Sequence, residues 1–237
     1  MFLHLLSLEV EGLQHKSLAR EGWLNYIVGR KKDRTFRQPQ STILGDALLK
    51  PQRVMKELAA VLPRDAVVVA ESGYAFWWSI VMLSMDKPRR FLTPAGNVAL
   101  GFGFTAGLGA KLARPENPVI SLVGDGGFMM TCQELATAVE LNIPTVVVIL
   151  NDGGYGAIRE YQSKGFQGRH IAVDLLNPDF VALAESFGAK GFRAEKPGDL
   201  EELLAEALAL EKPVLIDVQI DRREPLLPSF LTEMYKR

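Results

Sequence analysis

Residues 119–154 read VISLVGDGGFMMTCQELATAVELNIPTVVVILNDGG, and their pattern is the clearest indication of fold class in the chain. The stretch holds two mainly apolar runs, 119–123 and 145–150, which are typical of strands buried on both faces of a sheet. Between them, residues 131–141 follow a helical pattern that ends before a proline. A strand, a helix and a second apolar strand in this order favour an α/β arrangement with parallel strands.

The same alternation continues on both sides of this stretch. Further strands are expected at 66–70, 91–92 and 214–220. The helices expected around them are 51–62, 74–84, 101–112, 179–187 and 198–210. We therefore predict an α/β fold, a doubly wound, mostly parallel sheet with helices on both faces.

The first 50 residues differ from the remainder. Scattered apolar positions in 14–32 fit a helix that packs one face, and the basic segment KKDRTFRQPQ, 31–40, is typical of a linker. We predict that residues 1–50 are an extension or a remnant of another domain, and that 51–237 form the main domain. The alternative is that the N-terminal segment is an ordinary helix of the same domain.

Composition excludes several classes of protein. The 237 residues carry 27 basic and 28 acidic side chains, and this balance argues against a nucleic-acid-binding surface. Hydrophobic residues make up 48%, enough apolar surface to argue against intrinsic disorder. A single cysteine, Cys132, allows neither an internal disulfide nor a cysteine zinc cluster. The N-terminus lacks the basic start of a signal peptide, and no apolar run has the ~18 residues that cross a bilayer. We expect a soluble, cytoplasmic protein.

Polar loops follow three of the expected strands. Glu71, Ser72 and Gly73 follow the first, 124–127 the second and 151–154 the third. Ligands of such sheets bind at the carboxyl ends of the strands, so these loops are expected to form the site. Two of them carry an aspartate beside glycines, and two such aspartates can converge on one cation.

Oxygen ligands without histidine or cysteine favour Mg²⁺ or Ca²⁺ over zinc. Mg²⁺ takes one or two carboxylates and completes its shell with waters and phosphate oxygens, which implies a phosphate-bearing cofactor. A helix starting after Gly127 would direct its amides at those phosphates. The alternative is that both loops are tight turns in which the aspartate caps a helix.

The stretch from Val123 to Gly156 resembles the thiamine-diphosphate motif. In that family a Gly-Asp-Gly is followed, 27 positions after its aspartate, by the second residue of an Asn-Asn pair, and Asp125 and Asp152 have this spacing. The internal QELATAVE and the proline before the strand also match. Residues from about 51 to 228 resemble the C-terminal, diphosphate-binding domain of acetolactate synthase and its relatives, including benzoylformate decarboxylase. The N-terminal piece resembles the end of the central domain of such enzymes.

The resemblance implies a thiamine diphosphate and Mg²⁺ site. Asp125 would bind Mg²⁺ through its carboxylate, Asp152 would take the place of the usual asparagine, and Gly154 would offer its carbonyl. Asp152 adds a negative charge beside the diphosphate, so a stricter metal requirement is expected.

Further residues would hold the cofactor itself. Leu100 falls where a bulky apolar residue props the cofactor into its bent shape, and Tyr161 would lie near the cofactor or the substrate entrance. The remaining cofactor-binding residues implied are Ser72, Gly73, Tyr74, Asn97, Val98, Gly124, Gly126, Gly127, Tyr155 and Gly156. Residues 165–170 are predicted to form a lid.

The resemblance also implies an absence. The family supplies the glutamate that activates the aminopyrimidine from a separate pyrimidine-binding domain, which nothing in the sequence matches, so the catalytic residue is unknown. The chain is expected to be a component of a decarboxylase or carboligase acting on a small-molecule 2-oxo acid. It would work as a homo-oligomer or with a partner chain that carries the pyrimidine-binding domain, and without nucleic acid or membrane.

Two alternatives stay open at this point. The chain could be a catalytically inactive structural or regulatory domain that keeps the fold. It could also bind NAD, because Gly101, Gly103 and Ala106 fit G-x-G-x-x-A and Asp125 follows about 20 residues on. The segment 94–99, however, is a poor strand, whereas that motif needs an apolar strand immediately before its glycines.

Overall fold

The computed structural model describes residues 21–23, 25, 49–85, 87–88, 90–94 and 96–226. The chain divides into two compact units, Met1–Leu44 and Gly45–Arg237. In the first unit the described residues, 21–23 and 25, are helical, and the rest of the helix and linker predicted there lie outside the described residues. The domain boundary at residue 50 therefore stays a prediction.

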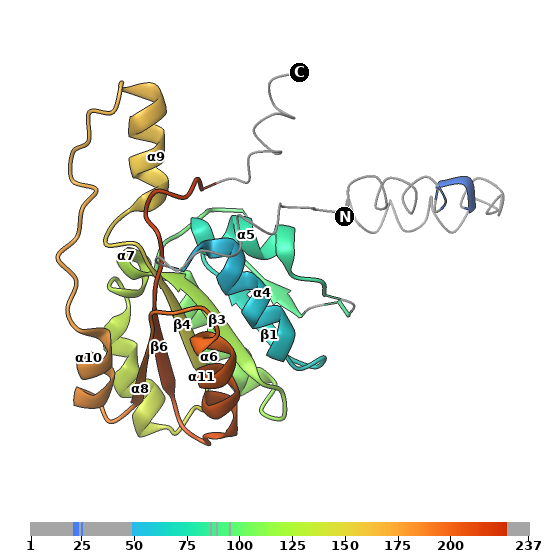
Figure 1. The fold of residues 1–237 in the computed structure, drawn as a ribbon. Coiled ribbons are helices and arrows are strands. Elements are labelled where there is room, and N and C mark those ends of the chain that lie inside the picture. The colour runs from blue at the N-terminus through green and yellow to red at the C-terminus, as the bar shows by residue number, and fades with distance from the viewer. Residues whose placement is uncertain are drawn as a thin grey trace, which may run out of the picture. The chain divides into compact units, whose positions relative to one another are not determined.

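Six parallel strands form one sheet in the described part of the chain, in the order β2-β1-β3-β4-β6-β5 (Figure 1). Their bounds are β1 Val67–Ala70, β2 Phe91–Leu92, β3 Val119–Gly124, β4 Val146–Asn151, β5 Lys190–Ala194 and β6 Val214–Gln219. The prediction of a doubly wound, mostly parallel sheet is confirmed.

Helices cover both faces of this sheet. Their bounds are α4 Pro51–Val61, α5 Tyr74–Met82, α6 Phe102–Ala113, α7 Asp125–Phe128, η1 Cys132–Glu134, α8 Leu135–Glu140, α9 Gly156–Gly165, α10 Phe180–Ser186 and α11 Asp199–Ala209. Helices α4, α5 and α11 pack on one face, and α6, α8 and α10 pack on the other.

Alternation along each strand divides the core between these faces. In β4, Val146, Val148 and Leu150 pack toward the α4, α5 and α11 side. Val147 and Ile149 pack toward α6 and α10. This is the period-two arrangement of a strand with two buried faces, and it explains why the sequence run is apolar throughout.

The strand order reverses at β1, which has β2 on one side and β3 on the other. A reversal of this kind opens a crevice at the carboxyl ends of the strands, where α/β sheets bind their ligands. The three polar loops noted in the sequence leave the sheet at this edge, after β1, β3 and β4.

The structure also departs from the expected elements. The sequence prediction missed β5 and α9, and the helix expected over 131–141 is divided into η1 and α8. Strand β5, KGFRA, lies at the sheet edge and is only partly buried, so it lacks the apolar run of the inner strands. Helix α9, GAIREYQSKG, is mostly polar and starts and ends with glycine.

The glycine segment of the NAD alternative does not follow a strand. Strand β2 ends at Leu92, and the described residues between it and α6 are turn and irregular structure. Gly101 has φ +80° and precedes α6 directly. The strand-to-glycine turn that dinucleotide binding needs is therefore missing from this part of the structure.

In the described residues, no helix has the length and apolar character needed to cross a membrane.

Candidate functional site

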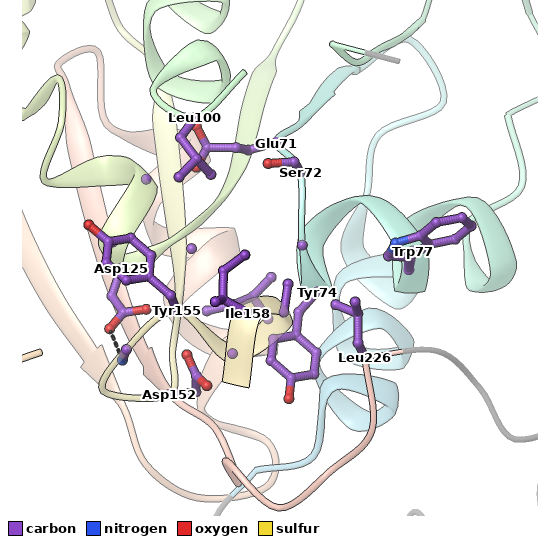
Figure 2. Close-up of a pocket in the computed structure, with 18 of the residues that line it drawn as sticks. Glu71, Ser72, Tyr74, Trp77, Leu100, Asp125, Asp152, Tyr155, Ile158 and Leu226 are labelled. Carbon is purple, nitrogen blue, oxygen red and sulfur yellow. Dashed lines mark hydrogen bonds between the residues drawn. The ribbon is translucent and has the colours of Figure 1, made fainter. Parts of the chain in front are cut away.

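A cavity of about 300 Å³ lies at the carboxyl ends of β1, β3 and β4 (Figure 2). The loops after these strands and the start of α9 form its walls, and Leu226 closes one side. The residues predicted from the sequence that line it are Ser72, Gly73, Tyr74, Val98, Leu100, Gly124, Asp125, Gly126, Gly127, Asp152, Gly154, Tyr155, Gly156 and Tyr161. Asn97 does not belong to the lining. The structure thus brings the predicted residues together from the loops after β1, β3 and β4, from the segment before α6, and from helices α5 and α9.

Asp125 is a buried carboxylate at the end of β3 and the first residue of α7. Its Oδ2 accepts hydrogen bonds from the backbone N–H of Gly154 (2.8 Å) and from Nδ2 of Asn177 (2.6 Å). Burial raises the pKa of Asp125, while these two donors favour the charged form. The carboxylate is therefore held in a fixed direction by neutral donors.

Asp152 follows the neighbouring strand β4 and is also buried. Burial and, to a smaller extent, the charge of Asp125 raise the pKa of Asp152 to about 6, although Arg159 acts in the opposite direction. Nη1 of Arg159 donates to Asp152 Oδ2 at 2.6 Å. Two acidic groups that disfavour each other's ionisation in one buried site are what a divalent cation relieves.

A chain of polar side chains supports Asp125 from behind. Asn151 donates through Nδ2 to Asp217 Oδ1 (2.9 Å), which leaves its Oδ1 to accept from Nδ2 of Asn177 (3.1 Å). Asp217, a buried residue of β6, is paired in turn with Arg193. An ionised carboxylate only accepts hydrogen bonds, so Asp217 fixes which way Asn151 faces and thereby orients the donor of Asn177.

Side chains closely approach Gly126 and Gly127, the two glycines that follow Asp125 in the loop after β3. A Cβ on Gly126 would lie 2.5 Å from Cε1 of Tyr155, and one on Gly127 would lie 1.9 Å from Oε2 of Glu71. Any side chain there would require these neighbours to move. Glycine at these two positions therefore allows Tyr155 and Glu71 to pack directly against the loop backbone.

Glu71 is a third buried carboxyl group in the cavity lining. Its Oε1 accepts from the backbone N–H of Gly103 (3.4 Å), and Oε2 has no hydrogen-bond partner among the described residues. Burial raises the pKa of Glu71 to about 7, against a smaller opposing effect of the backbone donors at the start of α6. Figure 2 shows it well apart from Asp152.

The mouth of the cavity is apolar. Val98, Leu100, Ile158 and Tyr161 line it and remain exposed, Leu100 to 43%. Tyr74 is buried deeper and donates its hydroxyl to the backbone carbonyl of Glu224 (2.7 Å), so it presents its ring rather than its hydroxyl. An apolar rim around a polar floor suits a ligand with one charged end and one aromatic end.

Arg159, Asn177 and Glu71 were given no role from the sequence. Asn177 lies 52 residues from Asp125 along the chain, and no spacing rule connects the two. Arg159 carried a usable signal, because an aspartate in place of asparagine at position 152 calls for a nearby cation. Glu71 was noted as a strand-end residue, but its burial depends on packing against α6 and Gly127.

The donor set of the cavity fits a hard cation. No group of three or more His, Cys, Asp or Glu residues suited to a metal occurs within the described residues. Two buried carboxylates and backbone oxygens form an all-oxygen set, which suits Mg²⁺ supplemented by water and phosphate and does not suit zinc.

Comparison with known proteins gives concordant matches. Residues 71–218 match the family described as "Thiamine pyrophosphate enzyme, C-terminal TPP binding domain". A "Probable acetolactate synthase large subunit" of Methanococcus aeolicus is 38% identical over 74% of this chain and 30% of that protein. The "Acetolactate synthase catalytic subunit, mitochondrial" of Saccharomyces cerevisiae is 34% identical over 88% of this chain and 31% of that protein.

A solved structure matches as well. It is a thiamine diphosphate-dependent 4-hydroxybenzoylformate decarboxylase of Rhodococcus jostii RHA1, with TM-score 0.70 and 34% identity over 75% of this chain and 33% of that one. The chain thus spans about a third of the length of the relatives that it matches.

Proposed function

We infer that this chain, which belongs to the thiamine pyrophosphate enzymes and carries their C-terminal TPP-binding domain, holds the diphosphate of its cofactor through Mg²⁺ at the carboxyl edge of the sheet. The main support is the pair of buried carboxylates, Asp125 and Asp152, at the ends of neighbouring strands. Mg²⁺ binds through one or two carboxylates and shares its remaining positions with water and phosphate oxygens. The carbonyl of Gly154 is the third protein ligand in this proposal.

The cofactor's diphosphate would lie on the first loop. The backbone of Gly126 and Gly127 carries no side chain that could keep a phosphate away, and Ser72 and Gly73 approach from the loop after β1. Leu100, exposed at the cavity mouth, has the bulk and position to support the cofactor between its two rings.

The proposed reaction is that of an acetolactate-synthase-like decarboxylase or carboligase acting on a 2-oxo acid. Bound thiamine diphosphate supplies the electron sink for loss of CO₂. The residues of this chain would bind and orient the diphosphate end, while the apolar side chains of Val98, Leu100 and Ile158 keep water from the aromatic end. We propose that a pyrimidine-binding domain on a partner chain contributes the activating glutamate.

Isothermal titration calorimetry tests the metal-linked site. Thiamine diphosphate is titrated into the full chain in buffer with Mg²⁺ and again in buffer with EDTA. Saturable heat that requires Mg²⁺ supports the proposal. Equal binding in both buffers would remove the metal from it, and no binding in either would favour a structural or regulatory domain. Asp65→Asn, at the opposite end of β1, is the matched control and should leave binding unchanged.

The partner proposal needs a separate experiment. CO₂ release from a panel of 2-oxo acids is measured with the chain alone and after addition of a chain that carries the pyrimidine-binding domain. Turnover that appears only in the mixture supports the proposal. Equal turnover by the chain alone would contradict the need for a partner.

A further inference from the structure

A buried positive charge lies beside Asp152, one of the two aspartates of the cavity. Arg159 is in the first turn of α9, seven residues after Asp152, and only 8% of its surface is exposed. Its Nη1 lies 2.6 Å from Asp152 Oδ2. Among the described residues, no other cation forms an ion pair with Asp152 or with Asp125. The buried group of Asp125, Asp152 and Arg159 therefore has two negative charges and one positive charge.

The local backbone leaves room for this ion pair. A Cβ on Gly156 would lie 2.5 Å from Asp152 Oδ2, and a Cβ on Gly154 would lie 2.4 Å from Nη2 of Arg159. Asp152 thus occupies the space that a side chain at position 156 would take, and Arg159 occupies the space that a side chain at position 154 would take. The glycines within 152–159, DGGYGAIR, therefore leave the space that the ion pair fills.

The remaining charged neighbour of Arg159 lies toward solvent. Nη2 of Arg159 lies 3.7 Å from Oδ1 of Asp174, whose side chain is 68% exposed. Asp174 also forms a closer ion pair with Arg222. A solvated carboxylate with its own cation interacts weakly with a second one, so Asp152 is the principal partner of Arg159.

We propose that Arg159 is a positioning residue that sets the charge of the cation site. By binding Asp152 Oδ2 it offsets one of the two carboxylates and leaves Asp152 Oδ1 for the metal. The site then offers a divalent cation two carboxylates at a net charge of −1, the same net charge as one aspartate and one neutral amide. This inference rests on the proposed Mg²⁺ site and adds the residue that makes an aspartate acceptable there.

If Arg159 sets the charge of the site, its removal should have a different effect on metal binding in the Asp152→Asn variant than if it only supported the fold. In Asp152→Asn, Arg159 remains as an uncompensated cation beside the metal and repels it. In Asp152→Asn/Arg159→Met the repulsion is gone, and the amide oxygen of the new asparagine can serve as a ligand. Removing Arg159 should therefore improve metal binding in the asparagine background. If Arg159 only supported the fold, the second substitution would weaken binding further.

The test measures metal binding rather than turnover. Mn²⁺ replaces Mg²⁺, and the free-ion electron paramagnetic resonance signal is followed with thiamine diphosphate present at a fixed concentration. We expect Asp152→Asn to raise the Kd for Mn²⁺ by about tenfold or more. The double variant should return to within about threefold of the unmodified chain. It removes both members of the buried ion pair together and leaves neither partner alone, so it is expected to fold.

Arg53→Met/Glu57→Gln is the matched control, because it removes another ion pair with a buried carboxylate, on α4, and should leave the Kd unchanged. Binding by the double variant that is as weak as in Asp152→Asn would overturn the inference and leave the proposed function standing. Equal binding by Asp152→Asn and the unmodified chain would overturn it as well. If the unmodified chain binds no Mn²⁺, both the proposed function and the inference fail.

Discussion

The loops after β3 and β4 have nearly the same sequence, Gly-Asp-Gly-Gly and Asn-Asp-Gly-Gly, yet their aspartates are held in different ways. Asp125 receives hydrogen bonds from neutral donors, the backbone of Gly154 and the amide of Asn177. Asp152 is bound by the guanidinium of Arg159. A shared motif therefore does not imply a shared environment, and the first loop carries the carboxylate whose charge is not offset.

The two glycines that follow Asp152 differ in how closely they are packed, and this difference gives the largest expected effect. Gly154→Ala would place a Cβ 2.1 Å from the carbonyl oxygen of Val173, which accepts the backbone N–H of Tyr155. We expect a loss of about 4 kcal/mol in the free energy of unfolding, measured by urea titration. The adjacent Gly153→Ala meets no atom within 4 Å but has φ +69°, so it should cost about 1 kcal/mol. Equal losses would contradict the packing described here.

Glu71, which packs against the loop after β3, has no ion-pair partner among the described residues. Burial raises the pKa of Glu71 from 4.5 to about 7, so the native chain holds this proton more tightly than the unfolded chain does. Its stabilising contribution is complete below about pH 4.5 and is lost as the pH rises through 7. For the cofactor-free chain this amounts to about 3 kcal/mol between pH 4.5 and pH 8.

Glu71→Gln should remove that pH dependence. The variant is expected to be more stable than the unmodified chain at pH 8 and nearly equal to it at pH 5, as measured by urea unfolding at both values. Asp152, whose pKa is raised to about 6, contributes a dependence of the same sign that the variant keeps. A variant that is less stable at pH 8 would show that the charged form of Glu71 is needed by the fold.

The two aspartates should differ in their effect on binding. Asp125→Asn removes the uncompensated charge and is expected to weaken Mg²⁺-dependent binding of thiamine diphosphate about a hundredfold, or about 2.7 kcal/mol. Asp152→Asn should weaken it about tenfold, because the lost carboxylate was already paired. Calorimetry on both variants checks the order, and a larger effect at Asp152 would reverse the comparison.

The smallest effect is expected from the neutral support of the first loop. Asn177→Ala removes one donor from Asp125 Oδ2 and should weaken the same binding about fivefold, or about 1 kcal/mol. Asn117→Ala, which removes an asparagine at the opposite edge of the sheet, is the control and should leave binding unchanged. Equal losses in the two variants would mean that Asn177 acts through general stability.

Much of this arrangement could be predicted from the sequence. The inner strands β1, β3, β4 and β6 follow from their mainly apolar runs, and the positions of Asp125 and Asp152 follow from their place at strand ends. The match to the thiamine pyrophosphate enzymes confirms the family resemblance and the cofactor class. The proposed reaction of the whole enzyme is inferred from relatives that are about three times as long as this chain.

The rest depended on contacts that local patterns do not contain. Strand β5 exposes part of its length at the sheet edge, so its sequence lacks the periodicity of a buried strand. Asn177 lies on the irregular segment before α10 and reaches Asp125 only because the sheet brings the two together. Asn97, expected to line the cofactor site, does not belong to the cavity lining, whereas its neighbour Val98 does.

We propose that one divalent cation binds between the loops after β3 and β4. The most direct measurement is an anomalous difference map from crystals of the full chain grown with thiamine diphosphate and Mn²⁺. We expect one strong peak within about 2.5 Å of carboxylate oxygens of both Asp125 and Asp152. A peak elsewhere, or bound cofactor with no peak between these two residues, would contradict it.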